Sequence, residues 1–429
     1  MSWNDHSADQ QADDAALDRL ALASPLLGAT GWIDGLARLV SIDTSATPGS
    51  YSGDFADVLQ DMFVPLGFSF RRLEVPPSVL PGTATAPRIN MIAGRRTGRR
   101  VCSIYFHTDT LPAGQGWTRP PFTLTRQGSR LYGRGSADMK GAMAAVWAAL
   151  RAADAVGLGL GYDPVLLFCT DQDRGLHPGL RYLTAQGLVE GHVMCLNGSA
   201  APRVWTGSCG SVRLTITIDG RQPRPPGSIN PIEAAAPLID RIVAMKAEVE
   251  ARRSQSPPPE SGYAGGRAGL SVSSIQGSVE GMGSPGPCHL TLDRRYAADE
   301  DFSAVLAELQ AGIVEGARRI PDFQVDTAVT GHCAPVIDPD KGPNWARWKQ
   351  ALSWGFGFAP GSFRHWSGSD ASPMGFAQQA GVPEVLLGGL RRPGGDPYGA
   401  DEYTTVEDVE ALARSVLAYL SDVAEVPRY

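Results

Sequence analysis

The strongest constraint on the fold is a pair of short apolar runs on either side of a long helical pattern. The runs "VCSIYF" and "PVLLF" each lead directly into a polar loop, and residues 141–157, "GAMAAVWAALRAADAVG", lie between them. The alanine-rich composition of that segment and its terminal glycine predict a helix. Strands that alternate with helices predict a largely parallel α/β sheet, with active residues where the strands end.

Other segments extend this pattern toward the N-terminus. Helical spacing of apolar residues predicts helices at 32–44 and 52–68, followed by the strands "FSFRRLEV" and "INMIAG". The first twenty residues are acidic and polar, so we expect a frayed lead-in with a single helical turn. They lack the basic start and apolar centre of a secretory signal, which favours a cytoplasmic protein.

Composition excludes several classes of partner. The net charge of −7 argues against a nucleic-acid surface, which needs a basic patch. No apolar run reaches the roughly 18 residues that a membrane span requires. The six cysteines include no C-x-x-C pair, so we expect reduced thiols in the core. A cysteine nucleophile paired with a histidine remains an alternative.

The texture of the sequence changes near residue 206. Strand-like and helix-like segments then follow in the order β-α-β-β-α-β, which predicts a ferredoxin-like inserted domain over 206–329. The segments 1–205 and 330–429 are predicted to form one α/β domain, whose last element is a helix. A chain of 429 residues is long enough for two such domains.

Two segments could carry chemistry. In "YFHTDT", His107 and Asp109 share one face of a strand, which suits a metal ligand and the acid that orients it. In "GRGSADMKG", Asp138 stands just before the helix, where a carboxylate can bridge two cations or cap the helix. Each segment taken alone also has a purely structural interpretation.

Residues 105–142, followed by "TDQDRG", "SGSDAS" and "GADEYTTVEDV", together resemble one family. It is the co-catalytic zinc peptidase family of acetylornithine deacetylase, succinyl-diaminopimelate desuccinylase, aminoacylase and glutamate carboxypeptidase. The resemblance implies a zinc-peptidase α/β domain with an inserted lid that pairs two subunits into a homodimer. It also implies a two-zinc site for amide bonds of acyl-amino-acid-like or peptide-like small molecules.

The family's metal site can be carried over by position. Its first-zinc histidine matches His107, with Asp109 as the orienting partner, and its bridging aspartate matches Asp138. The family's Asp-Glu-Glu-x-Gly matches "DQDRG" without a gap, beginning at Asp171. The general-base position therefore holds Gln172.

The remaining ligand positions depart from the family. The second-zinc acid is the shorter Asp173, and Asn197 stands where the first-zinc acid is expected. Tyr398, four residues before Glu402, stands at the position of the last histidine. The lid histidine has no match, and Arg224 is the best substitute in its loop.

These departures limit the expected chemistry. Glutamine can orient a water but cannot accept its proton, so the usual general base is missing at Gln172. A zinc site needs about three protein ligands, and too few acids and imidazoles remain for two metals. We expect zero or one divalent metal, zinc or manganese, and no dinuclear site.

Other side chains are candidates for substrate binding or for a rebuilt site. Arg295 matches a lid arginine near the substrate, although a structural salt bridge is an equal alternative. The further candidates are His177, His332, His365 and Asp370.

Three functions stay open. The first is an enzyme with altered chemistry on an amide or other C–N bond. The second is a catalytically dead homologue that binds a small ligand or a partner. The third is an ordinary metal-dependent amidohydrolase whose ligands are misassigned here.

Overall fold

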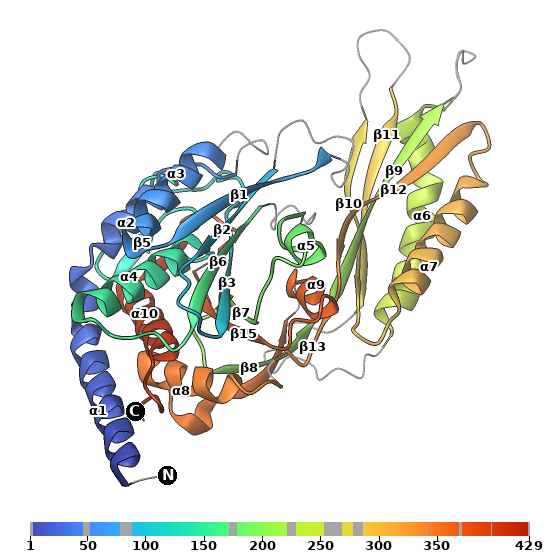
Figure 1. Cartoon of the computed structure of the whole chain (residues 1–429). Coiled ribbons are helices and arrows are strands. Elements are labelled where there is room, and N and C mark those ends of the chain that lie inside the picture. Colours follow the sequence, from blue (N-terminus) through green and yellow to red (C-terminus); the bar gives the residue numbers. More distant parts are fainter. Residues whose placement is uncertain are drawn as a thin grey trace.

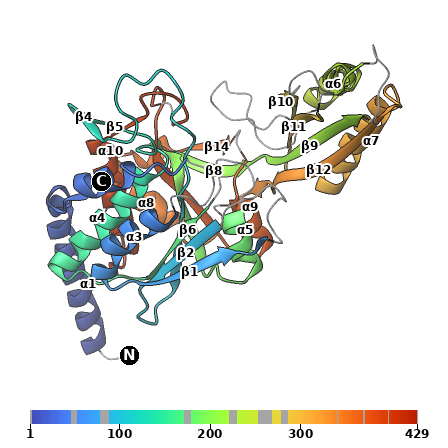
Figure 2. The same cartoon turned by 90° about the horizontal axis from the view of Figure 1, so that it is seen from above.

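The structure is a computed structural model. It describes residues 3–45, 52–77, 88–170, 178–220, 229–252, 268–277, 286–339, 341–368, 371–395 and 397–427. Two views show a larger α/β part from which a smaller sheet with two helices projects (Figures 1 and 2).

The larger part is built on a central sheet, six-stranded in the described residues. Its order is β1 (Ser69–Val75), β2 (Arg88–Gly94), β6 (Asp163–Cys169), β3 (Val101–His107), β7 (His192–Ser199) and β15 (Val385–Arg391). Strand β3 pairs in parallel with β6 and β7, and β15 pairs in parallel with β7. Only β2 runs against its neighbours. The predicted largely parallel sheet is confirmed, and the carboxyl ends of four strands meet at one edge.

Both faces of this sheet are buried. On one face Ile104 and Phe106 join the main core, whereas Tyr105 faces a second core on the other side. A parallel sheet with both faces covered needs apolar residues in succession, which explains the consecutive Ile104, Tyr105 and Phe106 in β3. Burial of each such side chain contributes about 2 kcal/mol.

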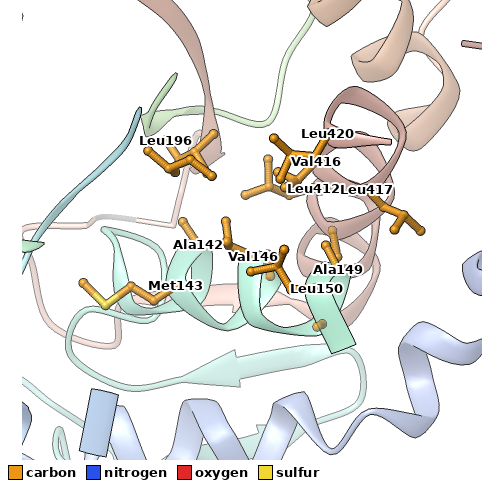
Figure 3. Close-up of a cluster of buried hydrophobic side chains, with 14 of the residues drawn as sticks. Ala142, Met143, Val146, Ala149, Leu150, Leu196, Leu412, Val416, Leu417 and Leu420 are labelled. Atoms are coloured by element: carbon orange, nitrogen blue, oxygen red, sulfur yellow. The ribbon is translucent and has the colours of Figure 1, made fainter. Parts of the chain in front are cut away.

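The main core lies between the sheet and a layer of helices. These are α1 (Trp3–Leu26), α2 (Trp32–Val40), α3 (Ser52–Phe63), α4 (Lys140–Val156), α8 (Trp345–Phe356) and α10 (Val406–Leu420). The predicted helix 141–157 is confirmed as α4, which ends at Gly157 in the left-handed conformation that glycine accepts readily. Figure 3 shows Ala149 of α4 beside α10 and Ala142 toward Leu196 of the sheet, with Leu412 and Val416 of α10 projecting into the space above α4.

The prediction of a single helical turn at the N-terminus was wrong. Helix α1 has 24 residues, and Ala16, Leu20 and Ala23 are buried in the main core. These three positions recur at helical spacing on one face. The acidic and polar residues at many other positions of the helix concealed that stripe.

The other face carries α5 (Pro178–Ala185) and α9 (Met374–Gln379). Leu180 and Leu183 of α5 and Met374 of α9 are buried against it. Two small sheets flank the larger part. One joins β13 (Val336–Ile337), β8 (Arg203–Ser208) and β14 (Arg364–Gly368), and the other joins β16 (Tyr403–Thr405), β5 (Arg130–Tyr132) and β4 (Thr125–Gln127).

The smaller part has the predicted ferredoxin-like order. Its elements are β9 (Gly210–Gly220), α6 (Pro231–Glu250), β10 (Gly269–Gly277), β11 (Cys288–Tyr296), α7 (Phe302–Ala317) and β12 (Phe323–Cys333). The sheet runs β10-β11-β9-β12 with antiparallel pairs, and α6 and α7 lie side by side on its outer face (Figure 1). Helix α6 begins in a capping box between Asn230 and Glu233.

The six cysteines are buried and none forms a disulfide, as predicted. Burial raises the pKa of the Cys102, Cys169 and Cys333 thiols, which opposes a role as nucleophile. No single helix among the described residues has the length and apolar character of a membrane span. The bent pair Gln11–Ala29 and Trp32–Val40 meets those two criteria only when its members are taken together.

Candidate active site at Asp138

The predicted ligand His107 is the last residue of β3 and is fully buried. Its Nδ1 lies 2.8 Å from the backbone carbonyl oxygen of Asp109 and 3.9 Å from the carboxylate Oδ1 of the same residue. The main-chain contact is therefore the closer of the two. The sequence had assigned the orienting role to the carboxylate.

The other ring nitrogen of His107 faces Asp138. Nε2 lies 3.2 Å from Oδ1 of that carboxylate. The carbonyl of Asp109 can only accept, so Nδ1 carries the hydrogen, and in a neutral ring Nε2 is then an acceptor. Two acceptors at this distance require a cation between them, either a proton or a metal ion. Two ligands of one tetrahedral zinc stand about 3.4 Å apart, which matches this spacing.

Asp138 is held in place by a buried carboxylate from the C-terminal segment. Glu402 accepts hydrogen bonds from the backbone N–H groups of Gly135 at 2.9 Å, Ala137 at 3.0 Å and Asp138 at 3.2 Å. Its Oε2 also forms an ion pair with Arg134 at 2.9 Å. The "GRGSAD" loop is thus wrapped around a single side chain, which fixes the direction of the Asp138 backbone.

The second oxygen of Asp138 contacts a positively charged side chain, that of Arg391. Nη2 of Arg391 forms a short ion pair with Oδ2 of Asp138 and donates to the hydroxyl oxygen of Tyr398 at 2.7 Å. The Tyr398 hydroxyl in turn lies 3.4 Å from Oδ2. The three side chains form a closed triangle beside His107.

Electrostatics keeps the Asp138 carboxylate ionised. Burial alone would raise the pKa of Asp138, but the charges of Arg391 and His107 outweigh burial and lower it to about 2. Burial also raises the pKa of Glu402 to about 7, against the hydrogen bond from Gly135 and the charge of Arg134. Burial lowers the pKa of Lys140 to about 7, and its Nζ donates to the Ile42 carbonyl at 2.8 Å.

The position of Arg391 follows from a close approach between β7 and β15. Gly389 lies opposite Gly198, and Arg391 lies opposite Ser199. A Cβ at Gly389 would stand 2.2 Å from the Gly198 carbonyl oxygen, so only glycine permits this pairing. The two strands can therefore end side by side, and Arg391 reaches the edge where β3 ends in His107.

Asn197, at a lost ligand position, lies on β7 and is partly buried. Its Oδ1 accepts a hydrogen bond from the Cys195 thiol at 3.1 Å. Burial raises the pKa of that thiol to about 12, so it remains a donor. The amide oxygen that we predicted to be a weak metal ligand therefore accepts a hydrogen bond from a residue of the same strand.

Other predicted residues lie away from this cluster or outside the described residues. Arg295 is exposed on β11, and His365 is exposed on β14. His332 stacks on Phe302 with ring centroids 3.9 Å apart and contacts Phe376 edge-on, so it packs the junction of the two parts. The predicted residues that fall outside the described residues are Asp171, Gln172, Asp173, His177, Arg224 and Asp370.

Sequence reasoning missed Arg391 and the role of Glu402. Arg391 and Asp138 are 253 positions apart, and no local pattern links them. A weak signal existed in "LRRPGG", where two arginines follow a buried strand end near the C-terminus. Within the described ranges, no three His, Cys, Asp or Glu side chains gather closely enough to hold a metal ion.

Comparison with known proteins relates the chain to a family. Over 213 residues the chain is 31% identical to acetylornithine deacetylase of Salmonella arizonae. That match covers 49% of this chain and 53% of the relative, so the chain spans about half the length of that relative.

Solved structures match over nearly the whole chain. The di-peptidase Dug1p of Saccharomyces cerevisiae has a TM-score of 0.76 at 15% identity, over 95% of this chain and 98% of that one. Human carnosine dipeptidase 1 has a TM-score of 0.74 at 15% identity, over 94% and 99%. At such identities the likeness shows the fold alone. Residues 103–422 match the profile of peptidase family M20/M25/M40, and the chain belongs to that family.

Proposed function

We propose that the protein acts on an amide or other C–N bond of an acyl-amino-acid-like or peptide-like metabolite. Its site holds at most one divalent metal and works without the family's glutamate general base. Membership of a metal-dependent peptidase family supports the reaction class. The observation that carries the proposal is that the two oxygens of Asp138 have different partners, His107 on one side and Arg391 on the other.

The first metal position fits the residues present. Nε2 of His107 and Oδ1 of Asp138 are two acceptors at the spacing of metal ligands, and both side chains are buried. By sequence, Asn197 stands at the third position, and it would be a weaker ligand because its Oδ1 already accepts a hydrogen bond from the Cys195 thiol. A divalent metal bound there would polarise the carbonyl oxygen of the scissile bond. Asp109 fixes the His107 ring through its carbonyl, so the ligand nitrogen points toward Asp138.

The second metal position does not fit. Tyr398 replaces an imidazole, and the guanidinium of Arg391 already occupies the side of Asp138 that faces it. We therefore derive no chemistry from a second metal, although Asp173 stands at its acid position by sequence. An arginine is ionised at every physiological pH, so this replacement is permanent.

Proton transfer needs a group other than Gln172. We assign to Gln172 the orientation of the attacking water, since an amide can donate and accept hydrogen bonds. The carboxylates of Asp171 and Asp173, on either side of Gln172 in the sequence, are the candidates that take the proton. Arg224, Arg295 and Asp370 are proposed to grip the polar ends of the substrate, together with His177 and His365.

The assembly belongs to the same proposal. We assign residues 1–205 and 330–429 to the catalytic-type domain and 206–329 to the lid. The lid is expected to pair two subunits into a homodimer in the cytoplasm. No nucleic-acid or membrane partner is proposed.

A catalytically dead homologue that binds a small ligand is the second candidate. The ion pair between Arg391 and Asp138 favours it, because it engages a carboxylate that family chemistry requires. The third candidate, an ordinary two-metal amidohydrolase, requires Arg391 to leave that carboxylate.

Turnover and metal content together test the proposal. The full chain, loaded with zinc or manganese and then desalted, would be assayed for amine release from N-acyl amino acids and dipeptides, with elemental analysis of each sample. We expect turnover with one metal equivalent or none, and its loss in Asp138→Asn. Two equivalents would support the ordinary amidohydrolase. Ligand binding with no turnover would support the dead homologue.

A further inference from the structure

Arg391 is a residue of the Asp138 cluster that the sequence motifs do not account for. It comes at the end of β15, and its guanidinium contacts the carboxylate that the family uses between two cations. The Asp138 side chain is 1% exposed and that of Arg391 is 22% exposed, so the ion pair is largely shielded from water. Such pairs are screened little by salt and are held by geometry.

Several features fix the guanidinium in that place. The close approach of Gly198 and Gly389 sets the register of β15 against β7. The Tyr398 hydroxyl accepts from Nη2 of Arg391, which turns the planar group toward Asp138. A long cationic side chain left free in water would populate many rotamers, whereas the contacts with Asp138 and Tyr398 hold this one in a single orientation.

We propose that the guanidinium of Arg391 is a built-in cation that takes the place of the second metal ion at Asp138, with Tyr398 as its positioning residue. This rests on the proposed function only in taking Asp138 as the bridging aspartate of the family. The two substitutions are complementary. Tyr398 removes the imidazole that would hold a metal there, and Arg391 supplies the positive charge that the metal would have brought.

The charge count agrees with this assignment. The Asp138 carboxylate carries one negative charge, and one guanidinium neutralises it through a single oxygen. Oδ1 then remains directed at His107 for one further cation. A second divalent ion at Oδ2 would stand against the fixed charge of Arg391, and like charges at contact distance repel strongly where water is excluded.

The test is a titration with metal alone, which does not depend on turnover. Wild type, Arg391→Gln and the double variant Arg391→Ala/Tyr398→His would be stripped of metal and titrated with Zn²⁺ by calorimetry. Elemental analysis after desalting would give the stoichiometry. We expect one additional equivalent in the double variant. In Arg391→Gln we expect affinity at Asp138 to rise roughly tenfold or more, because a repelling charge is gone.

Two matched variants serve as controls. Arg391→Lys keeps a positive charge at the same place and should keep the wild-type stoichiometry. Arg392→Ala removes the neighbouring arginine, which instead pairs with Asp408 at 2.6 Å, and should also leave metal binding unchanged. Circular dichroism would verify that each variant is folded. If the double variant is not folded, the change in Zn²⁺ affinity of Arg391→Gln tests the proposal alone.

The proposal is overturned if wild type binds two equivalents with Arg391 present, or if removal of Arg391 changes neither stoichiometry nor affinity. If removal of Arg391 changes neither quantity, the proposed function still stands, because it is tested separately by the turnover of the wild type and by its stoichiometry of one metal or none. Absence of turnover, with a second equivalent gained in the double variant, refutes the proposed function and supports the inference.

Discussion

Arg134 and Glu402 form an ion pair in which neither side chain reaches water. Their Nη1 and Oε2 atoms are 2.9 Å apart, and the side chains are 1% and 0% exposed. Nη1 of Arg134 also donates to the Pro397 carbonyl at 3.2 Å. The pair therefore connects the loop that carries Asp138 to the segment that carries Tyr398, and the site depends on it.

Removal of one partner should be costly. Arg134→Met leaves Glu402 buried without its counter-ion, so the carboxyl must take up a proton or stay as an unpaired charge, and we expect the free energy of unfolding to fall by about 3–5 kcal/mol. Urea denaturation followed by fluorescence measures this change. Arg38→Met is the control, because its pair with Asp61 is solvent-exposed and contributes no more than about 1 kcal/mol. Equal losses in both variants would contradict the role of burial.

A buried histidine should make stability depend on pH. Burial, aided by the nearby charge of Arg100, lowers the pKa of His192 to about 4. Nε2 of its ring lies 2.5 Å from the Tyr419 hydroxyl. Burial raises the pKa of Tyr419, so the hydroxyl keeps its proton and hydrogen-bonds to the neutral ring. Protonation of His192 would place a positive charge in this buried contact.

The unfolded chain binds this proton more tightly than the folded chain does. The stabilisation is therefore fully present above about pH 6.5 and is lost as the pH falls toward 4. We expect His192 to account for a loss of about 2 kcal/mol between pH 7 and pH 5. Urea unfolding at both pH values should show a smaller difference for His192→Gln. His365→Gln, at an exposed ring, should match wild type.

Much of the fold could be predicted because the signals are local. The apolar run of β3 and the alanine-rich α4 carry their own periodicity, and the β-α-β-β-α-β order of the lid is read directly along the chain. His107 and Asp138 could be found for the same reason, because each belongs to a short motif at the end of a strand or the start of a helix.

The parts that could not be predicted depend on distant pairing. Arg391 meets Asp138 only because β15 pairs with β7 in one register, and that register depends on two facing glycines. Likewise, Asp109 contacts His107 more closely through its carbonyl than through its carboxylate, a choice made by backbone geometry. Helix α1 was missed because its narrow apolar stripe is invisible in average composition.

The facing glycines give a direct test of that register. In Gly389→Ala, the new Cβ would stand 2.2 Å from the Gly198 carbonyl oxygen, so β15 must move away from β7. We expect a loss of about 1–3 kcal/mol in the free energy of unfolding, typical of overpacking. Gly361→Ala is the control, because a Cβ there meets nothing within 4 Å. If Gly389→Ala leaves the free energy of unfolding unchanged, the two strands can accommodate a Cβ at this position and the register does not depend on glycine.

The acceptor pair of His107 and Asp138 predicts that metal stabilises the fold. Nε2 and Oδ1, 3.2 Å apart, are brought together only when the chain is folded, so a metal held between them binds the folded state preferentially. At a free Zn²⁺ concentration about 100 times its Kd, we expect the free energy of unfolding to rise by about 3 kcal/mol. Thermal melting with and without Zn²⁺ measures the shift, and chelation should reverse it. His107→Ala should abolish the shift while His365→Ala, at an exposed ring on β14, keeps it. A shift that survives in His107→Ala and disappears in His365→Ala would move the metal to a different site altogether.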